Sequence, residues 1–305
     1  MINKRERMLD CLILIEDNLE KYYQENKNPE GIQLILNALN SQNIKYQLTN
    51  YKKIQTQKNT YTIKNQEYQY PKAIISLIIP QPEDKHYKKI RIDFEKHSKH
   101  INPYKQSKLV KNKIKTLQTL QNIKNIQTPK TILLNENTQL KETINTLKLP
   151  IILKPNKGEK GEKIQLIKTE NQLKNTTKKL PPNQYILQEA ITESFGKDIR
   201  IVTAGNKIIY AIQRTNTKKF ISNRNQGGTI KQIPIPENIK ETSIKIIQKL
   251  KLNYASIDFL IKKDQYILCE VNSFPGLTLP IQKLKNKDYT IYNNLKTTLL
   301  KILNF

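Results

Sequence analysis

Glycine, cysteine and tryptophan are scarce in this chain of 305 residues, which has 8 glycines, 2 cysteines and no tryptophan. The two cysteines, Cys11 and Cys269, both fall in predicted strands. So few cysteines argue against a structural disulfide or a cysteine-rich metal cluster, and they favour a reducing cytoplasm as the location of the protein.

Long apolar runs are also absent. The longest, at 12–15 and 73–79, have the length of a strand, whereas a transmembrane helix needs about 20 apolar residues. We therefore expect no membrane span. The first run is followed at once by Glu16 and Asp17, which argues against a signal peptide.

Acidic residues are few, because 26 Asp and Glu stand against 53 Lys and Arg and leave a formal net charge of +27. Such a charge would attract an acidic peptide or a nucleic acid. The basic residues are spread evenly along the chain, however, as expected from a general drift of the amino-acid composition toward Lys, Asn and Ile. They also form no recognisable nucleic-acid-binding motif. Nucleic acid is therefore the less expected partner. The three histidines (His86, His97 and His100) lack paired metal-ligand spacing and are expected at the surface.

Strands and helices alternate along the first third of the chain. Strands are predicted at 12–15, 44–48 and 73–79, and a helix begins after Pro29. This alternation indicates a small open α/β domain. Farther along, apolar spacing predicts strands at 131–134, 150–155, 185–188 and 207–213, and helices at 107–124, 138–147, 236–250 and 288–303. Asp288 is the expected N-cap of the last helix, and the length of the chain suits two or three lobes.

The stretch 254–277 carries the most informative polar residues. It is predicted to form two strands joined by a tight turn, with Asp258 on the first strand and Glu270 and Asn272 on the second. Glu270 and Asn272 are two residues apart and leave the same face. A three-residue turn would place Asp258 opposite Glu270, whereas a two-residue turn would place it opposite Cys269 and direct the two carboxylates to opposite faces.

Two carboxylates and an amide oxygen directed at one point are costly without a cation. An all-oxygen set of this kind suits magnesium or manganese. The alternative is that Asp258 and Glu270 are solvated charges of an edge strand and that Asn272 belongs to a turn.

Three further groups of residues point to an anionic ligand. Lys154 ends an apolar strand, where a buried ammonium needs a compensating anion. Gly158 opens the run GEKGEK, which by itself is a weak motif: it fits an ordinary hairpin loop, and also a loop whose backbone wraps phosphate. Arg200 shares a face with Asp198, and Arg214 ends the return strand. The arginines are expected to clamp carboxylate or phosphate, or else to form surface ion pairs.

An Asp on one strand followed by EVNSFPGL on the next resembles the ATP-grasp superfamily, and most closely its RimK-like, peptide-modifying ligases. The resemblance implies an ATP-grasp fold behind a small N-terminal α/β domain. It divides the chain into an N-terminal domain at 1–105, a central lid lobe at 106–188 and a C-terminal lobe at 189–305. It also assigns the metal, magnesium or manganese, to Asp258, Glu270 and Asn272.

The same resemblance implies a nucleotide site. The residues assigned to bind ATP are Lys113 and Lys154 at the phosphates, Glu189, Ala190 and Ile191 at the adenine, Asp198 at the ribose, and Ser222 and Asn223 in a matching FxSN stretch. Three positions depart from the family pattern: Asn112 replaces an Asp, Lys163 a glycine of the loop, and Ile221 an Arg.

The activity that the resemblance implies is ATP-dependent ligation of a carboxylate to an amine through an acyl phosphate, on an amino acid or an acidic peptide or protein. Arg214 is the candidate that stabilises the oxyanion of the tetrahedral intermediate, with Arg200 as a second charge clamp. No nucleophilic Ser or Cys is needed. The alternatives are an ATP-grasp protein that binds nucleotide without catalysis and a basic nucleic-acid-binding protein; an oligomer is compatible with either reading.

Overall fold

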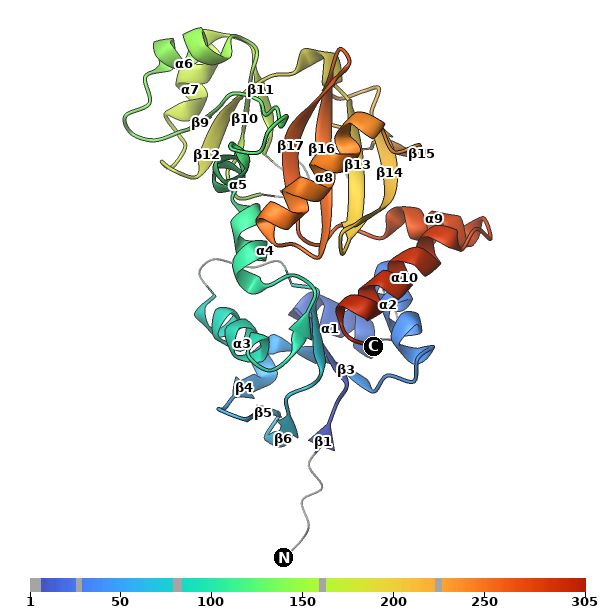
Figure 1. The fold of residues 1–305 in the computed structure, drawn as a ribbon. Coiled ribbons are helices and arrows are strands. Elements are labelled where there is room, and N and C mark those ends of the chain that lie inside the picture. The colour runs from blue at the N-terminus through green and yellow to red at the C-terminus, as the bar shows by residue number, and fades with distance from the viewer. Residues whose placement is uncertain (1–6, 26–28, 79–83, 159–162, 223–226) are drawn as a thin grey trace, which may run out of the picture. The chain divides into compact units, whose positions relative to one another are not determined.

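The computed structural model describes residues 7–25, 29–78, 84–158, 163–222 and 227–305 (Figure 1). The chain divides into two compact units. Unit 1 comprises Met1–Lys108, Leu252–Tyr254 and Phe274–Phe305, and unit 2 comprises Leu109–Lys251 and Ala255–Ser273. The predicted division into three parts stays a prediction. No helix in the described ranges is long and apolar enough to cross a membrane.

Unit 1 contains the predicted open α/β sheet. Its strands pair in parallel, in the order β3 (Tyr46–Asn50), β2 (Cys11–Ile15), β7 (Ala73–Ser76) and β8 (Lys99–His100). All five residues of β2 are buried, as expected for a strand covered on both faces. The predicted α/β character of this region is therefore confirmed.

A second sheet in unit 1 was not predicted. It runs in the order β1 (Arg7–Met8), β6 (Gln66–Gln69), β5 (Thr60–Ile63) and β4 (Ile54–Thr56). Tyr61 and Tyr68 are buried in this sheet, and their rings stack at 5.4 Å between centroids. Strands this short, with polar residues between the aromatic ones, gave too weak a periodicity to recognise.

The helices of unit 1 are α1 (Asp17–Gln24), α2 (Glu30–Asn40), the 3₁₀ turn η1 (Tyr51–Lys53), α3 (Lys85–Glu95), α4 (Tyr104–Lys111), which continues into unit 2, α9 (Thr278–Lys285) and α10 (Thr290–Ile302). They include two that the apolar spacing predicted, α2 and α10. Helix α2 begins after Pro29, as predicted. Helix α10 begins with Tyr289 as its N-cap rather than Asp288, although the Asp288 carboxylate accepts a hydrogen bond from the Thr290 N–H (3.1 Å).

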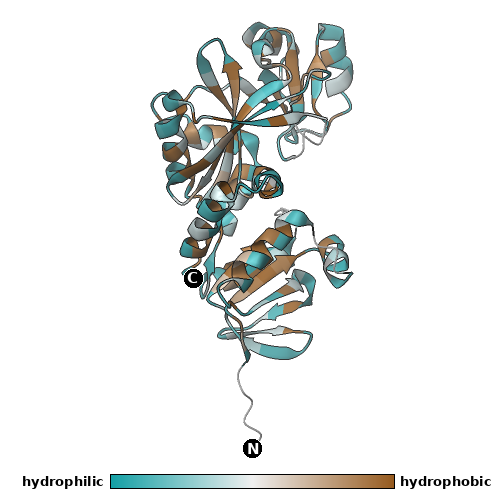
Figure 2. Ribbon diagram, turned by 90° about the vertical axis from the view of Figure 1, so that its right-hand side faces the viewer, coloured by the Kyte–Doolittle hydropathy of each residue, from teal (hydrophilic) through white to brown (hydrophobic). Residues whose placement is uncertain are grey.

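Unit 2 is built on two antiparallel sheets. The first has the order β11 (Gln165–Ile167), β10 (Ile151–Pro155), β12 (Tyr185–Glu189) and β9 (Thr131–Leu133), and helices α6 (Leu140–Leu147) and α7 (Glu170–Thr177) accompany it. Its apolar core includes Leu153, Leu173 and Leu187, all fully buried. Figure 2 shows hydrophobic residues in the strands of the sheets and, alternating with hydrophilic ones, along the helices.

The second sheet of unit 2 carries the predicted hairpin. Its order is β15 (Thr229–Ile233), β14 (Lys207–Thr215), β13 (Lys197–Ala204), β16 (Tyr254–Lys262) and β17 (Gln265–Asn272). The remaining elements are α5 (Lys113–Leu120), the 3₁₀ turn η2 (Thr192–Ser194) and α8 (Glu237–Leu250).

The prediction of one continuous helix at 107–124 was wrong. The structure breaks it at Asn112 into α4 and α5. Asn112 has an extended backbone and its side chain accepts a hydrogen bond from the Lys115 N–H (3.0 Å), so it caps a new helix. The apolar residues keep their helical spacing across the break, so the pattern gives no sign of it.

Candidate active site

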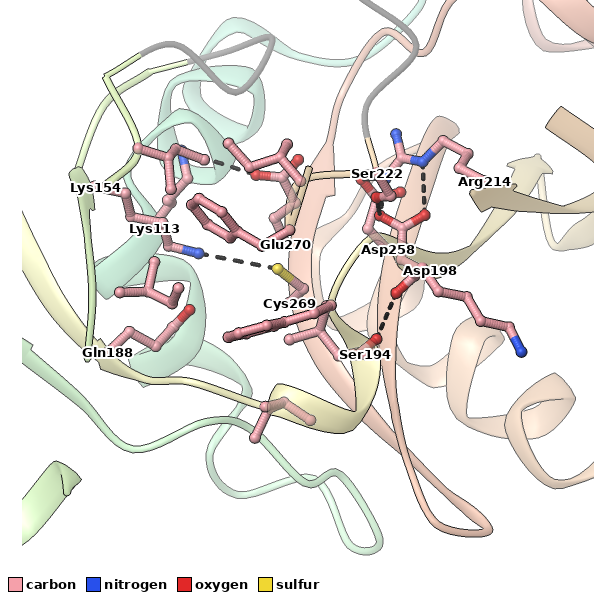
Figure 3. A pocket seen from close by; sticks show the side chains of 18 of the residues that line it. Lys113, Lys154, Gln188, Ser194, Asp198, Arg214, Ser222, Asp258, Cys269 and Glu270 are labelled. Carbon is pink, nitrogen blue, oxygen red and sulfur yellow. Dashed lines mark hydrogen bonds and ion pairs between the residues drawn. The ribbon is translucent and has the colours of Figure 1, made fainter. Parts of the chain in front are cut away.

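A pocket in unit 2 draws side chains from both of its sheets (Figure 3). Nine residues singled out in the sequence line it: Lys113, Lys154, Glu189, Ile191, Asp198, Arg214, Ser222, Asp258 and Glu270. In Figure 3 the two lysines lie on one side, the Asp198, Asp258 and Arg214 side chains on the other, and Glu270 and Cys269 between them. Ala190, Arg200 and Asn272 are not among the lining residues, and Asn223 lies outside the described residues.

The register of the β16–β17 hairpin combines features of both turns that the sequence allowed. Lys262 pairs with Gln265, so the turn has two residues. The ladder nevertheless pairs Asp258 with Glu270, because a β-bulge interrupts it between Phe259 and Asp258. One extra residue on β17, Cys269, restores the register that a two-residue turn alone would lose.

Glu270 stands at the centre of the pocket's polar contacts. Its side chain is 26% exposed, and the Lys113 ammonium lies 3.8 Å from its Oε2. The Asn272 amide is 3.4 Å from its Oε1, and Asp258 is its partner across the β16–β17 ladder. The structure therefore brings the three predicted metal ligands together around Glu270.

A buried network joins two carboxylates to two arginines. Arg200 binds Asp258 through two hydrogen bonds of 2.7 Å. Arg214 binds Asp198 through bonds of 2.7 and 2.5 Å and also donates to Asp258 (2.9 Å). The Ser222 hydroxyl completes the network, 2.6 Å from Asp198. Arg200 thus binds Asp258 rather than its strand neighbour Asp198, and the Arg214–Asp198 pair is largely buried, with both side chains 8% exposed.

Burial and charge act in opposite directions on these two carboxylates. Burial alone would raise the pKa of Asp258, but the positive charges of Arg200 and Arg214 outweigh it and hold this pKa well below its usual range. For Asp198, burial outweighs the hydrogen bonds from Arg214, and its pKa is raised. Asp258 is thus a fixed negative charge, whereas Asp198 gains a proton more readily than an ordinary aspartate.

Lys154 ends β10 with its ammonium inside the pocket. The residue is only 4% exposed, and within the described ranges the hydrogen-bond partner of its Nζ is the Cys269 sulfur at 3.9 Å. Burial raises the pKa of the Cys269 thiol to about 11, so this partner stays neutral. A buried ammonium beside a neutral thiol favours an anionic ligand.

The remaining predicted contacts lie along the pocket's edges. The Lys113 ammonium donates to the Gly158 carbonyl (2.8 Å). Glu189 ends β12, where its carboxylate accepts from the Lys130 N–H and from the Lys262 ammonium, both at 3.2 Å. Of the predicted glycine-rich loop, 159–162 lies outside the described residues.

Among the lining residues that were not singled out as site residues, four carry a polar or thiol side chain: Gln188, Ser194, Lys197 and Cys269. Gln188 and Lys197 flank recognised motifs and could have been found from their positions. Cys269 could not, because only the bulge turns it toward the pocket together with Glu270.

The oxygen donors present fit a hard divalent cation. Glu270, Asp258 and the Asn272 amide supply carboxylate and amide oxygens, and two arginines already share Asp258. The described residues contain no group of three His, Cys, Asp or Glu side chains that could hold a metal by themselves. Magnesium keeps water and takes phosphate oxygens to fill its shell, so two carboxylates and one amide oxygen are compatible with it.

Comparison with known proteins identifies a family. A family model described as a RimK-like ATP-grasp domain matches residues 110–292. The chain is 31% identical over 159 residues to an uncharacterized protein of Mycoplasma genitalium, a match that covers 52% of this chain and 53% of that protein. It is 36% identical over 143 residues to a probable alpha-L-glutamate ligase of Coxiella burnetii, covering 46% and 47%. The chain therefore spans about half the length of these curated relatives.

Solved structures share the fold over nearly the whole chain. The ATP-grasp ligase PsnB, complexed with a phosphomimetic variant of minimal precursor, Mg and ADP, matches with a TM-score of 0.68. The match covers 96% of this chain and 98% of that chain at 13% identity. At this identity the likeness shows the architecture alone, and it confirms the predicted fold class.

Proposed function

The chain belongs to the RimK-like ATP-grasp family, and from this premise we propose that it is an ATP-dependent ligase that joins a carboxylate to an amine through an acyl phosphate. The observation that carries the proposal is the convergence of Lys113, Lys154, Asp258 and Glu270 on one pocket of unit 2. A nucleoside triphosphate is bound by positively charged side chains and by a divalent cation. This cavity contains two ammonium groups and oxygen ligands that suit such a cation.

Two relatives support the class of substrate. The Coxiella relative is named a probable alpha-L-glutamate ligase, and the PsnB structure holds a variant of a minimal precursor together with ADP and Mg. An amino acid such as glutamate, joined to a peptide or protein, is therefore the substrate pair that we propose. The net charge of +27 would favour an acidic peptide. A cytoplasmic location and the three-lobe division remain part of the same proposal.

The proposed nucleotide contacts follow the pocket from one sheet to the other. Lys113 and Lys154 would neutralise the phosphates, since both ammonium groups are largely desolvated. Glu189, Ala190 and Ile191, which end β12 and follow it, would hold the adenine, and Asp198 the ribose. Ser222 and Asn223 would complete this part of the site.

Glu270, Asn272 and Asp258 would hold magnesium or manganese, whose charge, when bound, offsets that of the β- and γ-phosphates. The residues of the chain do the remaining work. Arg200 and Arg214 fix the Asp258 carboxylate in its charged form. Arg214 also lines the pocket, where its guanidinium can face an oxyanion.

The proposed reaction has two steps. An oxygen of the substrate carboxylate attacks the γ-phosphorus of ATP, and the bond between this phosphorus and the β–γ bridging oxygen breaks. ADP departs, and the substrate becomes an acyl phosphate. The amine nitrogen then attacks the acyl carbon. Its tetrahedral intermediate collapses to the amide, and phosphate departs with the former carboxylate oxygen while the nitrogen loses its proton. Charge neutralisation and positioning carry both steps.

Phosphate release tests the proposal. Wild-type protein and Glu270→Gln are incubated with ATP, magnesium and pools of amino acids and acidic peptides. Release that depends on an added acceptor, and that falls at least about 100-fold in the variant, supports a ligase; omitting pool members one at a time then identifies the substrates. Tight ATP binding without turnover in any pool would instead favour the nucleotide-binding alternative.

A further inference from the structure

Asn156 links the two segments that carry the pocket's phosphate-facing lysine and the loop after β10. It is 3% exposed, and its backbone N–H donates to the Gln184 carbonyl (2.8 Å). Its carbonyl accepts from the Lys113 N–H (3.0 Å), and its side-chain Oδ1 accepts from the Ile114 N–H (3.1 Å). A residue that lies 42 positions away thus binds the first two amides of helix α5.

The other donors at this N-terminus also have partners. The Lys115 N–H donates to the Asn112 side chain (3.0 Å), and the Asn112 N–H donates to the Leu109 carbonyl (3.0 Å). The Thr116 N–H makes the first regular bond of the helix, to the Asn112 carbonyl (3.0 Å). A helix leaves four N-terminal donors without partners inside it, and Asn156 satisfies two of the four from another part of the fold.

Lys113 is held at both ends by the same short segment. Its backbone N–H donates to Asn156, and its ammonium donates to the Gly158 carbonyl (2.8 Å). The segment is itself compact, because a Cβ added at Gly158 would lie 3.0 Å from the Pro155 Cβ. Because both the backbone and the ammonium of Lys113 are already held, nucleotide binding has less of this flexible side chain left to order.

We propose that Asn156 is a positioning residue for nucleotide binding, which acts through Lys113 by locking the start of helix α5 to the loop after β10. The inference rests on the proposed function, since it assigns Lys113 to the phosphates. Asn112 provides a matched control, because it caps the same helix by the same kind of hydrogen bond, and within the described residues its hydrogen bonds go to Leu109, Lys115 and Thr116 rather than to that loop.

Calorimetric titration with ADP and magnesium tests the inference on the full chain. Asn156→Ala should bind ADP about tenfold more weakly than wild type, as expected when a charged hydrogen bond loses its alignment. Asn112→Ala should lose comparable thermal stability yet bind ADP within about twofold of wild type. Should Asn156→Ala fail to fold, Asn156→Ser, which leaves a smaller cavity, takes its place.

A double-mutant cycle distinguishes positioning from a general loss of structure. In a Lys113→Met background, Asn156→Ala should weaken ADP binding by less than about twofold, because the group through which it acts is gone. Equal losses in both backgrounds, or equal losses for Asn112→Ala and Asn156→Ala, would overturn the inference. Wild-type protein that binds no ADP would remove its premise, and the proposed function with it.

Discussion

Replacing Arg214 with methionine should destabilise unit 2 by about 3–5 kcal/mol. The Arg214, Asp198 and Asp258 side chains are 8%, 8% and 2% exposed, so the lost charge is largely desolvated. The change removes both arginine bonds to Asp198 and one of the three to Asp258. Asp258 keeps Arg200, but Asp198 keeps only the Ser222 hydroxyl among the network's donors. Most of the cost should therefore fall on Asp198.

This loss of stability is measured by urea unfolding monitored by circular dichroism, because the chain has no tryptophan whose fluorescence could be used. With a slope of about 2 kcal/mol per M, the midpoint should fall by roughly 1.5–2.5 M. Lys240→Met is the control, because its ion pair with Glu237 is exposed (55% and 86%) and is expected to contribute at most about 1 kcal/mol. Adding Asp198→Asn to Arg214→Met should restore part of the lost stability.

The pH dependence gives a second readout of the same variant. Burial already raises the pKa of Asp198, and losing Arg214 raises it further. The folded state then binds a proton that the unfolded state has released, so the stability of the variant falls as pH rises from about 4. Its deficit should be smaller at pH 5 than at pH 8. The buried network as described would be refuted if Arg214→Met lowered the urea midpoint by less than about 0.5 M at pH 8. It would also be refuted if adding Asp198→Asn restored none of the lost stability.

Two further predictions concern a glycine and the thiols. Gly196→Ala should destabilise unit 2 by more than about 3 kcal/mol, because φ is +67° and the new Cβ would lie 2.2 Å from the Asn216 carbonyl oxygen. Gly227→Ala, with φ of +91° and no atom within 4 Å, should cost only about 1 kcal/mol; similar midpoint shifts for the two variants would contradict this. Neither thiol should react quickly with a disulfide reagent at pH 7, because burial raises the pKa of Cys11 to about 12 and of Cys269 to about 11. Two thiols should react in denaturant, and rapid labelling of the native protein would contradict the raised pKa values of the two thiols.

The alternation of elements could be predicted from the sequence because it depends on local patterns, whereas Lys113, Glu189 and Ser222 were assigned only through the family resemblance. Lys154 at the end of an apolar strand, and Glu270 two residues before Asn272, are visible without any tertiary information. The side-by-side placement of Asp258 and Glu270 was open, because a β-bulge depends on how the whole ladder pairs rather than on the residues of the turn.

Contacts between distant segments were beyond the sequence patterns. Asn156 and helix α5 are 42 residues apart, and nothing in the spacing of either segment indicates their hydrogen bonds. The binding of Arg214 to both Asp198 and Asp258 likewise depends on the neighbouring positions of β13, β14 and β16 in the sheet. Short strands such as β4–β6 were missed for a different reason, since three or four residues are too few to show a period.

Transfer of an isotopic label tests the central claim most directly. Pooled amino acids and acidic peptides with ¹⁸O in their carboxylates are supplied with ATP and magnesium, and the released phosphate is analysed by mass spectrometry. Activation through an acyl phosphate predicts one ¹⁸O in each phosphate formed with the amide, since the former carboxylate oxygen leaves with the phosphoryl group. Phosphate released without ¹⁸O would show that ATP is hydrolysed by water and would contradict the ligase assignment.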